Sequence, residues 1–122
     1  MDDAPLSATQ RVLLPMISDD AYGFWELVWL DTNAQRPQEA AEALLNLFRR
    51  GYAEVYEAEP GASAQERLIT NREVGEAAIQ DLSNWKSPPD PMRERWYFAF
   101  VTPAGTAKWI ADAESGFPGK PS

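Results

Sequence analysis

A helix that ends in glycine and leads directly into a strand is the feature that most constrains this fold. Pro37 suits the first turn of a helix, and PQEAAEALLNLFRR carries apolar residues at helical spacing. Gly51 follows the two arginines, and glycine readily adopts the left-handed conformation that ends many helices. The next residues, YAEVYEAE, are rich in strand formers. The sequence therefore predicts a helix over 37–50 and a strand over 52–59.

The helix over 37–50 is expected to be amphipathic. Its inward face consists of Ala41, Leu44, Leu45, Phe48 and Tyr52. Its outward face consists of Glu39, Glu42, Ala43 and Asn46, with Arg49 and Arg50 at the far end.

A second strand and a final helix follow later in the chain. Residues 95–101, RWYFAFV, are apolar on both faces and predict a strand. Thr102 and Pro103 are typical of a helix start and predict a helix over 103–113. We expect the strands over 52–59 and 95–101 to pair antiparallel beside the helices over 37–50 and 103–113.

A further helix is predicted between the two strands. Thr70 and Glu73 have the spacing of a capping box. The apolar face of this helix consists of Val74, Ala78, Ile79, Leu82 and Trp85. The other face of this helix carries Glu73, Glu76, Gln80 and Asn84.

The N-terminal part leaves alternatives open. Residues 11–18 are apolar but contain Pro15, so they form either a short helix that breaks at Pro15 or an edge strand. The capping-box spacing of Ser7 and Gln10 favours the helix.

The segment YGFWELVWLD, residues 22–31, concentrates aromatic and aliphatic side chains. Ser18, Asp19 and Asp20 favour a helix that starts there and runs to about Asp31. A strand is the alternative, in which the one charge, Glu26, shares a face with Phe24, Val28 and Leu30 instead of marking a polar face. We expect this segment to be a central core element whose rings meet the strand over 95–101. The tryptophans are expected in the core rather than on a binding platform: Trp25, Trp29, Trp85, Trp96 and Trp109.

Length and composition indicate one folded domain. The chain of 122 residues is long enough to bury a core, and we assign residues 11–114 to it, with flexible tails over 1–10 and 115–122. The first residues, MDD, do not resemble a basic leader, and no apolar run is long enough to span a membrane. These features predict a cytoplasmic protein, and the absence of cysteine is compatible with this.

The residue types that are missing exclude much chemistry. Without histidine or cysteine there is no triad, no thiolate and no common zinc ligand set. The acidic stretch EVYEAE, with Glu54, Glu57 and Glu59, is a candidate acid/base or metal-ligand cluster, but a solvated surface explains it better. The sequence therefore predicts a protein that is not an enzyme and holds no metal or cofactor.

Two segments together resemble a winged-helix domain. ALLNLFRRGYAEVYEAE joins a helix to a strand through Arg-Gly, and YFAFVTPAGTAKWI joins a strand to a helix through Thr-Pro-x-Gly. In that family the two strands form a β-ribbon, the wing, and the final helix packs behind it. The resemblance covers roughly residues 19–113 and implies an α+β fold, a mostly helical winged-helix-like domain with a small antiparallel β-ribbon. The chain departs from the family in having little room for a middle helix before residue 37 and a helical insertion in the wing.

The resemblance implies a transcriptional regulator that binds DNA as a dimer, with residues 37–50 as the recognition helix. Candidate DNA contacts would be Arg49, Arg50, Arg93 and Arg95. The net charge of −8 disfavours this function, because DNA affinity depends on neutralised phosphates. The favoured alternative is a module that binds another protein, for instance a basic one, through an acidic surface. The candidate surface residues are Glu39, Glu42, Asn46, Glu54, Glu57, Glu73 and Glu76.

Overall fold

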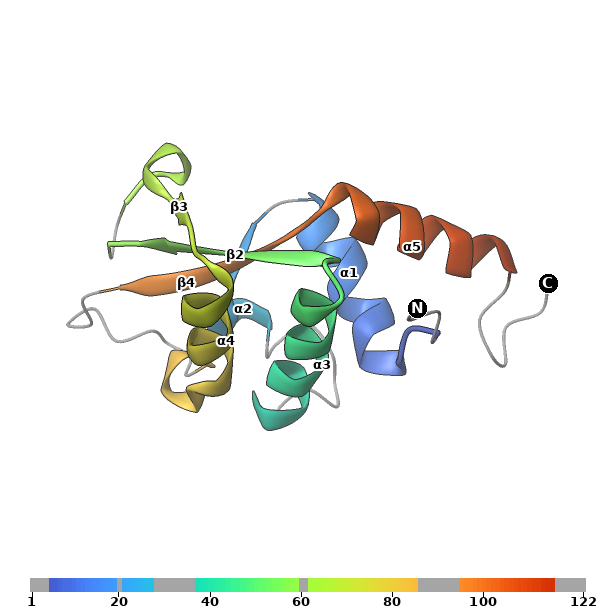
Figure 1. Cartoon of the computed structure of the whole chain (residues 1–122), viewed down its shortest axis with the longest axis horizontal. Coiled ribbons are helices and arrows are strands. Elements are labelled where there is room, and N and C mark those ends of the chain that lie inside the picture. The colour runs from blue at the N-terminus through green and yellow to red at the C-terminus, as the bar shows by residue number, and fades with distance from the viewer. Residues whose placement is uncertain (1–4, 20, 28–36, 60–61, 86–94, 116–122) are drawn as a thin grey trace.

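The computed structural model describes residues 5–19, 21–27, 37–59, 62–85 and 95–115 (Figure 1). Within them the chain forms helices and strands in a mixed order, which confirms the predicted α+β class. The elements are α1 (Ala8–Asp19), β1 (Tyr22–Gly23), α2 (Phe24–Leu27), α3 (Pro37–Arg49), β2 (Ala53–Ala58), the 3₁₀ helix η1 (Ala64–Glu66), β3 (Leu68–Ile69), α4 (Arg72–Gln80), the 3₁₀ helix η2 (Leu82–Trp85), β4 (Trp96–Val101) and α5 (Pro103–Ser115).

The strands form one antiparallel sheet in the order β1–β4–β2–β3. β2 and β4 pair along their whole length, from Ala53 opposite Val101 to Ala58 opposite Trp96. This confirms the predicted pairing of 52–59 with 95–101. The two-residue strands β1 and β3, which the sequence did not predict, extend the sheet beyond β4 and β2 respectively.

The main core lies between the sheet and the helices. α2, α3 and α4 lie on the same side of the sheet, below it in Figure 1. Val55 and Ala99 are fully buried on the core face of the paired strands. They join side chains of α1 and α3 in one apolar cluster, which includes Leu13, Leu14, Ile17, Leu44 and Leu47.

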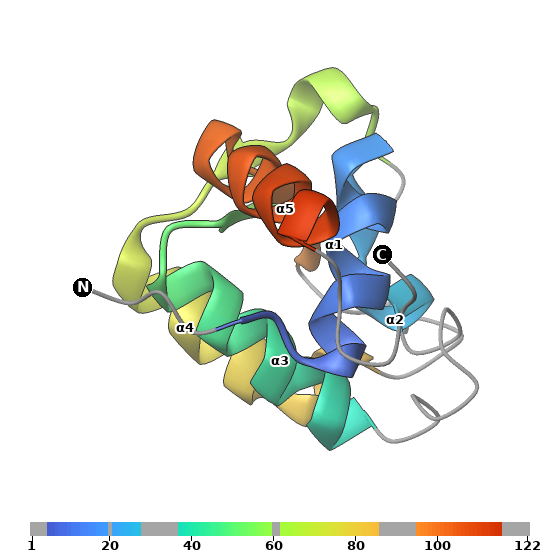
Figure 2. The ribbon, with the colours of Figure 1, turned by 90° about the vertical axis from the view of Figure 1, so that its right-hand side faces the viewer.

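Residues 11–18 belong to a helix, as the capping-box spacing favoured, but α1 continues through Pro15 to Asp19, so the expected break at Pro15 is wrong. The Ser7 hydroxyl accepts from the N–H of Gln10 (3.2 Å), and the Gln10 side chain accepts from the N–H of Ser7 (2.9 Å). Gln10 also donates to the carbonyl of Ala43 and to Asn46 Oδ1, which fixes α1 against α3 (Figure 2). α1 begins at Ala8 and Leu6 is buried, so part of the segment predicted as a tail packs on the domain.

The segment after α1 differs from the predicted helix over about 20–31. Tyr22 and Gly23 pair with β4, and only Phe24–Leu27 is helical, while residues 28–31 lie outside the described residues. Glu26 supplies the physical reason, because its carboxylate accepts from the N–H of Gly23 (2.9 Å) and caps a new helical turn there. The charge that fitted neither predicted pattern is thus a cap.

The aromatic rings of this segment meet β4, as predicted. Phe24 stacks on Trp85 at 4.7 Å and on Tyr97 at 6.1 Å between ring centroids. On the opposite face of β4, Trp25 contacts Trp96 and Phe98 at 5.0 and 5.3 Å. Of the other tryptophans, Trp85 is buried, Trp109 is half-buried, and Trp29 lies outside the described residues.

The helix–glycine–strand unit is confirmed. α3 ends at Arg49, Gly51 has a φ of +79°, and β2 begins at Ala53. One side chain of the predicted outward face is placed differently, because Ala43 is buried. α1 packs against α3 on that side and α4 packs on another, so α3 buries more than one stripe.

The insertion between β2 and β4 contains α4, but its cap differs from the prediction. Asn71 Oδ1, not Thr70, accepts from the N–H of Val74 (2.8 Å), because the Thr70 hydroxyl instead donates to the carbonyl of Val55 (3.0 Å). α4 ends at Gln80 rather than continuing to residue 85. Asn84, predicted on the polar face, is buried and donates to the carbonyl of Ala78 (2.9 Å).

The final helix, α5, begins as predicted at Thr102 and Pro103, because the Thr102 hydroxyl accepts from the N–H of Gly105 (3.0 Å). Its C-terminal part holds the N-terminal segment. Asp112, whose side chain is 13% exposed, accepts from the backbone N–H of Leu6 (3.1 Å) and from Lys108 (3.0 Å). The N-terminal segment and α5 are therefore joined by a largely buried carboxylate.

Substitution of two glycines separates backbone conformation from crowding. Gly51→Ala should lower the free energy of unfolding by about 1–2 kcal/mol, because alanine is strained at positive φ although the space is open. Gly105→Ala should lower the free energy of unfolding by more than Gly51→Ala does, because the alanine Cβ would collide with the Tyr52 carbonyl. This holds although alanine is the better helix former. Urea denaturation measures both. A Gly105→Ala variant as stable as the parent protein would contradict the close approach of α5 to Tyr52.

Asp112→Asn tests the carboxylate that holds the N-terminal segment. Burial raises the pKa of Asp112, but the Leu6 N–H, Lys108 and Arg50 outweigh it and hold that pKa below its ordinary value. The lowered pKa means that the carboxylate stabilises the fold above pH ~4 and loses this effect as the pH falls through the lowered value. The variant should lose about 1–2 kcal/mol at pH 7. The difference from the parent, measured by urea denaturation, should shrink below pH ~4, and a constant difference down to pH ~2 would contradict the assignment.

Candidate functional site

The predicted acidic surface residues do not form one continuous surface. Glu39, Glu42 and Asn46 lie on α3, and Glu73 and Glu76 lie on α4, in the helical layer. Glu54 and Glu57 lie on β2. Glu57 is opposite Tyr97 and Glu54 is opposite Phe100, so their side chains leave the sheet on different faces. The seven residues therefore divide into a helical group and a pair split by the sheet.

The stretch EVYEAE gives no sign of shared acid/base work. The Tyr56 hydroxyl donates to Glu54 Oε2 (2.9 Å), and burial together with the Glu54 carboxylate raises the pKa of Tyr56. Glu59 lies 3.8 Å from the Arg95 guanidinium. Among the described residues no group of three or more carboxylates is arranged to hold a metal ion. The contacts of Glu54 with Tyr56 and of Glu59 with Arg95 are therefore structural.

The candidate DNA contacts are engaged within the chain. Arg49 Nε donates to Glu76 Oε1 (2.9 Å), and this contact, with weaker help from Arg72, lowers the pKa of Glu76. Arg50 lies over the Tyr52 ring at 4.8 Å and donates to Asn46 Oδ1 (3.4 Å). Arg95 faces Glu59, as described above, and Arg93 lies outside the described residues. All three described arginines therefore contact a carboxylate, an amide or a ring of their own protein.

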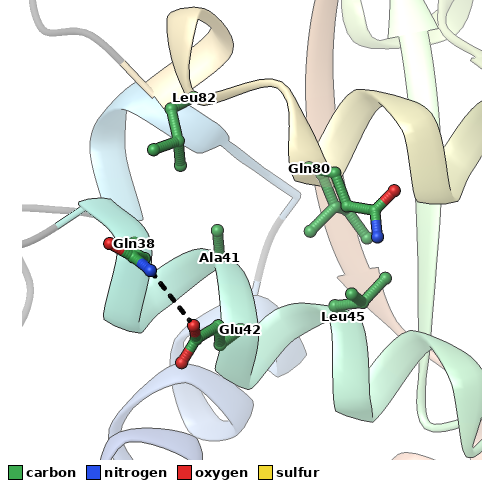
Figure 3. A pocket seen from close by; sticks show the side chains of 7 residues that line it. Gln38, Ala41, Glu42, Leu45, Gln80 and Leu82 are labelled. Atoms are coloured by element: carbon green, nitrogen blue, oxygen red, sulfur yellow. Dashed lines mark hydrogen bonds between the residues drawn. The ribbon is translucent and has the colours of Figure 1, made fainter.

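A groove between α3 and α4–η2 is the feature that the sequence did not predict. Its volume is about 420 Å³ (Figure 3). Its residues come from the first two turns of α3 and from the end of α4 with η2: Gln38, Ala41, Glu42, Leu45, Ile79, Gln80 and Leu82. Ala41 and Ile79 are buried and form the floor, whereas Gln38, Glu42, Gln80 and Leu82 are exposed. The site is therefore an open groove with an apolar floor.

The break after α4 explains why the groove was missed. The predicted helix placed Leu82 on the buried face with Trp85. In the structure Asp81 ends α4, and its carboxylate accepts from the N–H and hydroxyl of Ser83 (3.0 and 2.6 Å). This turn leaves Leu82 44% exposed, while Trp85 is buried with its indole donating to the carbonyl of Ile79 (2.9 Å). The sequence Asp-Leu-Ser, typical of a side-chain-capped turn, was the available signal.

Searches with protein-family models, curated proteins and solved structures find no match to this chain. Within the described ranges, every helix is too short or too polar to span a bilayer.

Burial separates the floor of the groove from its wall. Ile79→Ala should lower the free energy of unfolding by about 2–5 kcal/mol, because Ile79 is fully buried and its truncation leaves a cavity. Leu82→Ser should cost less than about 1 kcal/mol, because much of Leu82 is already in water. Urea denaturation compares the two variants. A cost for Leu82→Ser as large as that for Ile79→Ala would mean that Leu82 belongs to the core.

Proposed function

We propose that this protein is a non-catalytic, winged-helix-like module that binds another protein through an acidic surface on its helical layer. The overall charge supports a binding role toward basic rather than acidic molecules, because 19 acidic residues stand against 11 basic ones. The cysteine-free composition suits a cytoplasmic setting, which is part of the proposal.

The winged-helix part of the proposal is supported by two features. β2 and β4 form an antiparallel ribbon, and α5 leaves β4 directly and packs on α1. The insertion of η1, β3, α4 and η2 between the two ribbon strands departs from a simple wing. Between α1 and α3 the described residues contain one helical turn, α2. The inserted α4 also covers one side of α3, the helix that the resemblance assigns to DNA.

The engagement of the arginines is the observation that carries the proposal against DNA. A protein that binds DNA gains affinity when basic side chains neutralise phosphates and release counterions. Arg49 would first have to leave Glu76, and Arg50 would have to leave the Tyr52 ring. The N-terminal half of α3, the part that would enter the major groove, presents Glu39 and Glu42 instead. Its carboxylates would be repelled by the phosphates on both sides.

Binding to duplex DNA at low salt tests this choice. Low salt is the condition most favourable to DNA binding, so fluorescence anisotropy with random and genomic upstream duplexes at about 20 mM salt should show no association. The positive control is a basic winged-helix protein under the same conditions. Tight binding that weakens steeply with salt would contradict the protein-partner proposal and support a DNA-binding transcriptional regulator. In that case Arg49→Gln and Arg50→Gln should each reduce the dependence on salt.

A further inference from the structure

We propose that the groove between α3 and α4–η2 docks a basic amphipathic helix of the partner protein. This inference rests on the proposed function and names the site and the chemistry of the partner. It differs from the broader acidic surface in that only Glu42 of the predicted surface residues lines the groove.

The shape of the groove favours a helix over an extended peptide. Arg49 lies beside Glu76 at one end of the helix pair, and Gln38 and Ala41 line the groove with Leu82 at the other end, so α3 and α4 run antiparallel. Helices use their backbone hydrogen bonds internally, and such walls offer no sheet edge to an extended chain. A third helix can pack its apolar ridge between two helices. From Gln38 to Leu45 the wall rises roughly 10 Å, which matches about two turns of a docked helix.

The openness of the groove favours a macromolecule over an enclosed small ligand. Leu82 is 44% exposed at the rim, and Leu45, half-buried, lies on the opposite wall (Figure 3). The buried Ala41 and Ile79 line the same groove. Apolar side chains spaced along one face of a helix, at positions i, i+3 or i+4, and i+7, would cover this floor and remove Leu82 from water.

Charge segregation along the helix pair favours a basic partner. Residues 37–45 and 77–85 contain three acids, Glu39, Glu42 and Asp81, and no lysine or arginine. At the opposite end of the pair, Arg49 and Arg72 neutralise Glu76. The end that holds the groove is therefore the acidic end of the described helix pair. Arg36 and Lys86, which flank these two segments in the sequence, lie outside the described residues.

The test uses a defined probe and the full-length protein. The probe is a fluorescein-labelled, 15-residue helical peptide with leucines at positions i, i+4, i+7 and i+11 and lysines on both flanks of that stripe. Its twin carries glutamate in place of every lysine. Anisotropy titration should show binding of the lysine peptide that weakens with salt, and at least about tenfold weaker binding of the glutamate twin. Absence of binding by the lysine peptide, or equal binding of both peptides, would overturn the inference.

Matched variants locate the binding site. Leu82→Asp and Leu68→Asp add the same charge at exposed leucines, one in the groove and one on β3. Glu42→Gln and Glu114→Gln remove the same charge, one at the groove and one on α5, outside the predicted acidic surface. We expect Leu82→Asp to weaken binding about tenfold or more and Glu42→Gln to weaken it a few-fold. The two control variants, one for each substitution, should bind as tightly as the parent protein. Circular dichroism confirms that each variant is folded.

The outcomes distinguish the site from the function. If the lysine peptide binds but Leu82→Asp matches Leu68→Asp, the groove is overturned while a protein-binding role stands. If Glu42→Gln and Glu114→Gln weaken binding equally, net charge alone attracts the peptide and the groove is again overturned. Failure of the proposed function itself has a separate sign, namely salt-dependent binding to duplex DNA by the parent protein.

Discussion

The meeting of two chain reversals, one around Gly51 and one around Thr102, is the contact on which the rest of this fold depends. At the first, the N–H groups of Gly51 and Tyr52 close α3 on the carbonyls of Phe48 and Leu47 (3.1 and 2.9 Å), which requires the positive φ of Gly51. At the second, the Thr102 side chain starts α5. Thr102 also joins the two, because its N–H donates to the Tyr52 carbonyl (3.1 Å) and its hydroxyl donates to the Gly51 carbonyl. Both helix–strand units are thus held in one register, and the β2–β4 pairing extends from this point.

Local signals at this junction explain how much of the fold was predictable. Several of these signals act on backbone groups within a few residues, namely Gly51, Thr102 and the pair Ser7 and Gln10. Their effect can therefore be predicted without knowledge of the tertiary structure. The prediction errors arise where a group distant in the sequence determines which of two neighbouring residues takes a structural role. Thr70 and Asn71 can each cap a helix, and the carbonyl of Val55, on another strand, engages the Thr70 hydroxyl and leaves the cap to Asn71. The groove could not be predicted from the sequence for the same reason, because it depends on the turn at Asp81 and on the packing of η2 against α2 and α3.

The distribution of charge, rather than its sum, is what the structure adds to the functional argument. A net charge of −8 could be spread evenly, and it would then act mainly on solubility. Instead Arg49 and Arg72 contact Glu76 at one end of the α3–α4 pair. The described charged residues at the other end are all acidic, namely Glu39, Glu42 and Asp81. Exposed ion pairs of this kind add little stability. Their main consequence is to remove positive charge from the surface that a recognition helix would use.

The insertion that departs from a simple wing is also what builds the groove. Without α4 and η2, Ala41 and Leu45 of α3 would have no apolar wall beside them. η2 is held in place from inside, because Trp85 stacks on Phe24 at 4.7 Å and its indole donates to the carbonyl of Ile79 (2.9 Å), while Asn84 donates to the carbonyl of Ala78. These buried contacts fix the turn that presents Leu82 at the rim. A wall that is ordered before a partner arrives loses little conformational entropy on binding, so even a groove of about 420 Å³ can contribute to affinity. The aromatic density of the segment around Phe24 therefore serves the surface as well as the core, since the ring that stacks on Trp85 also fixes the groove wall.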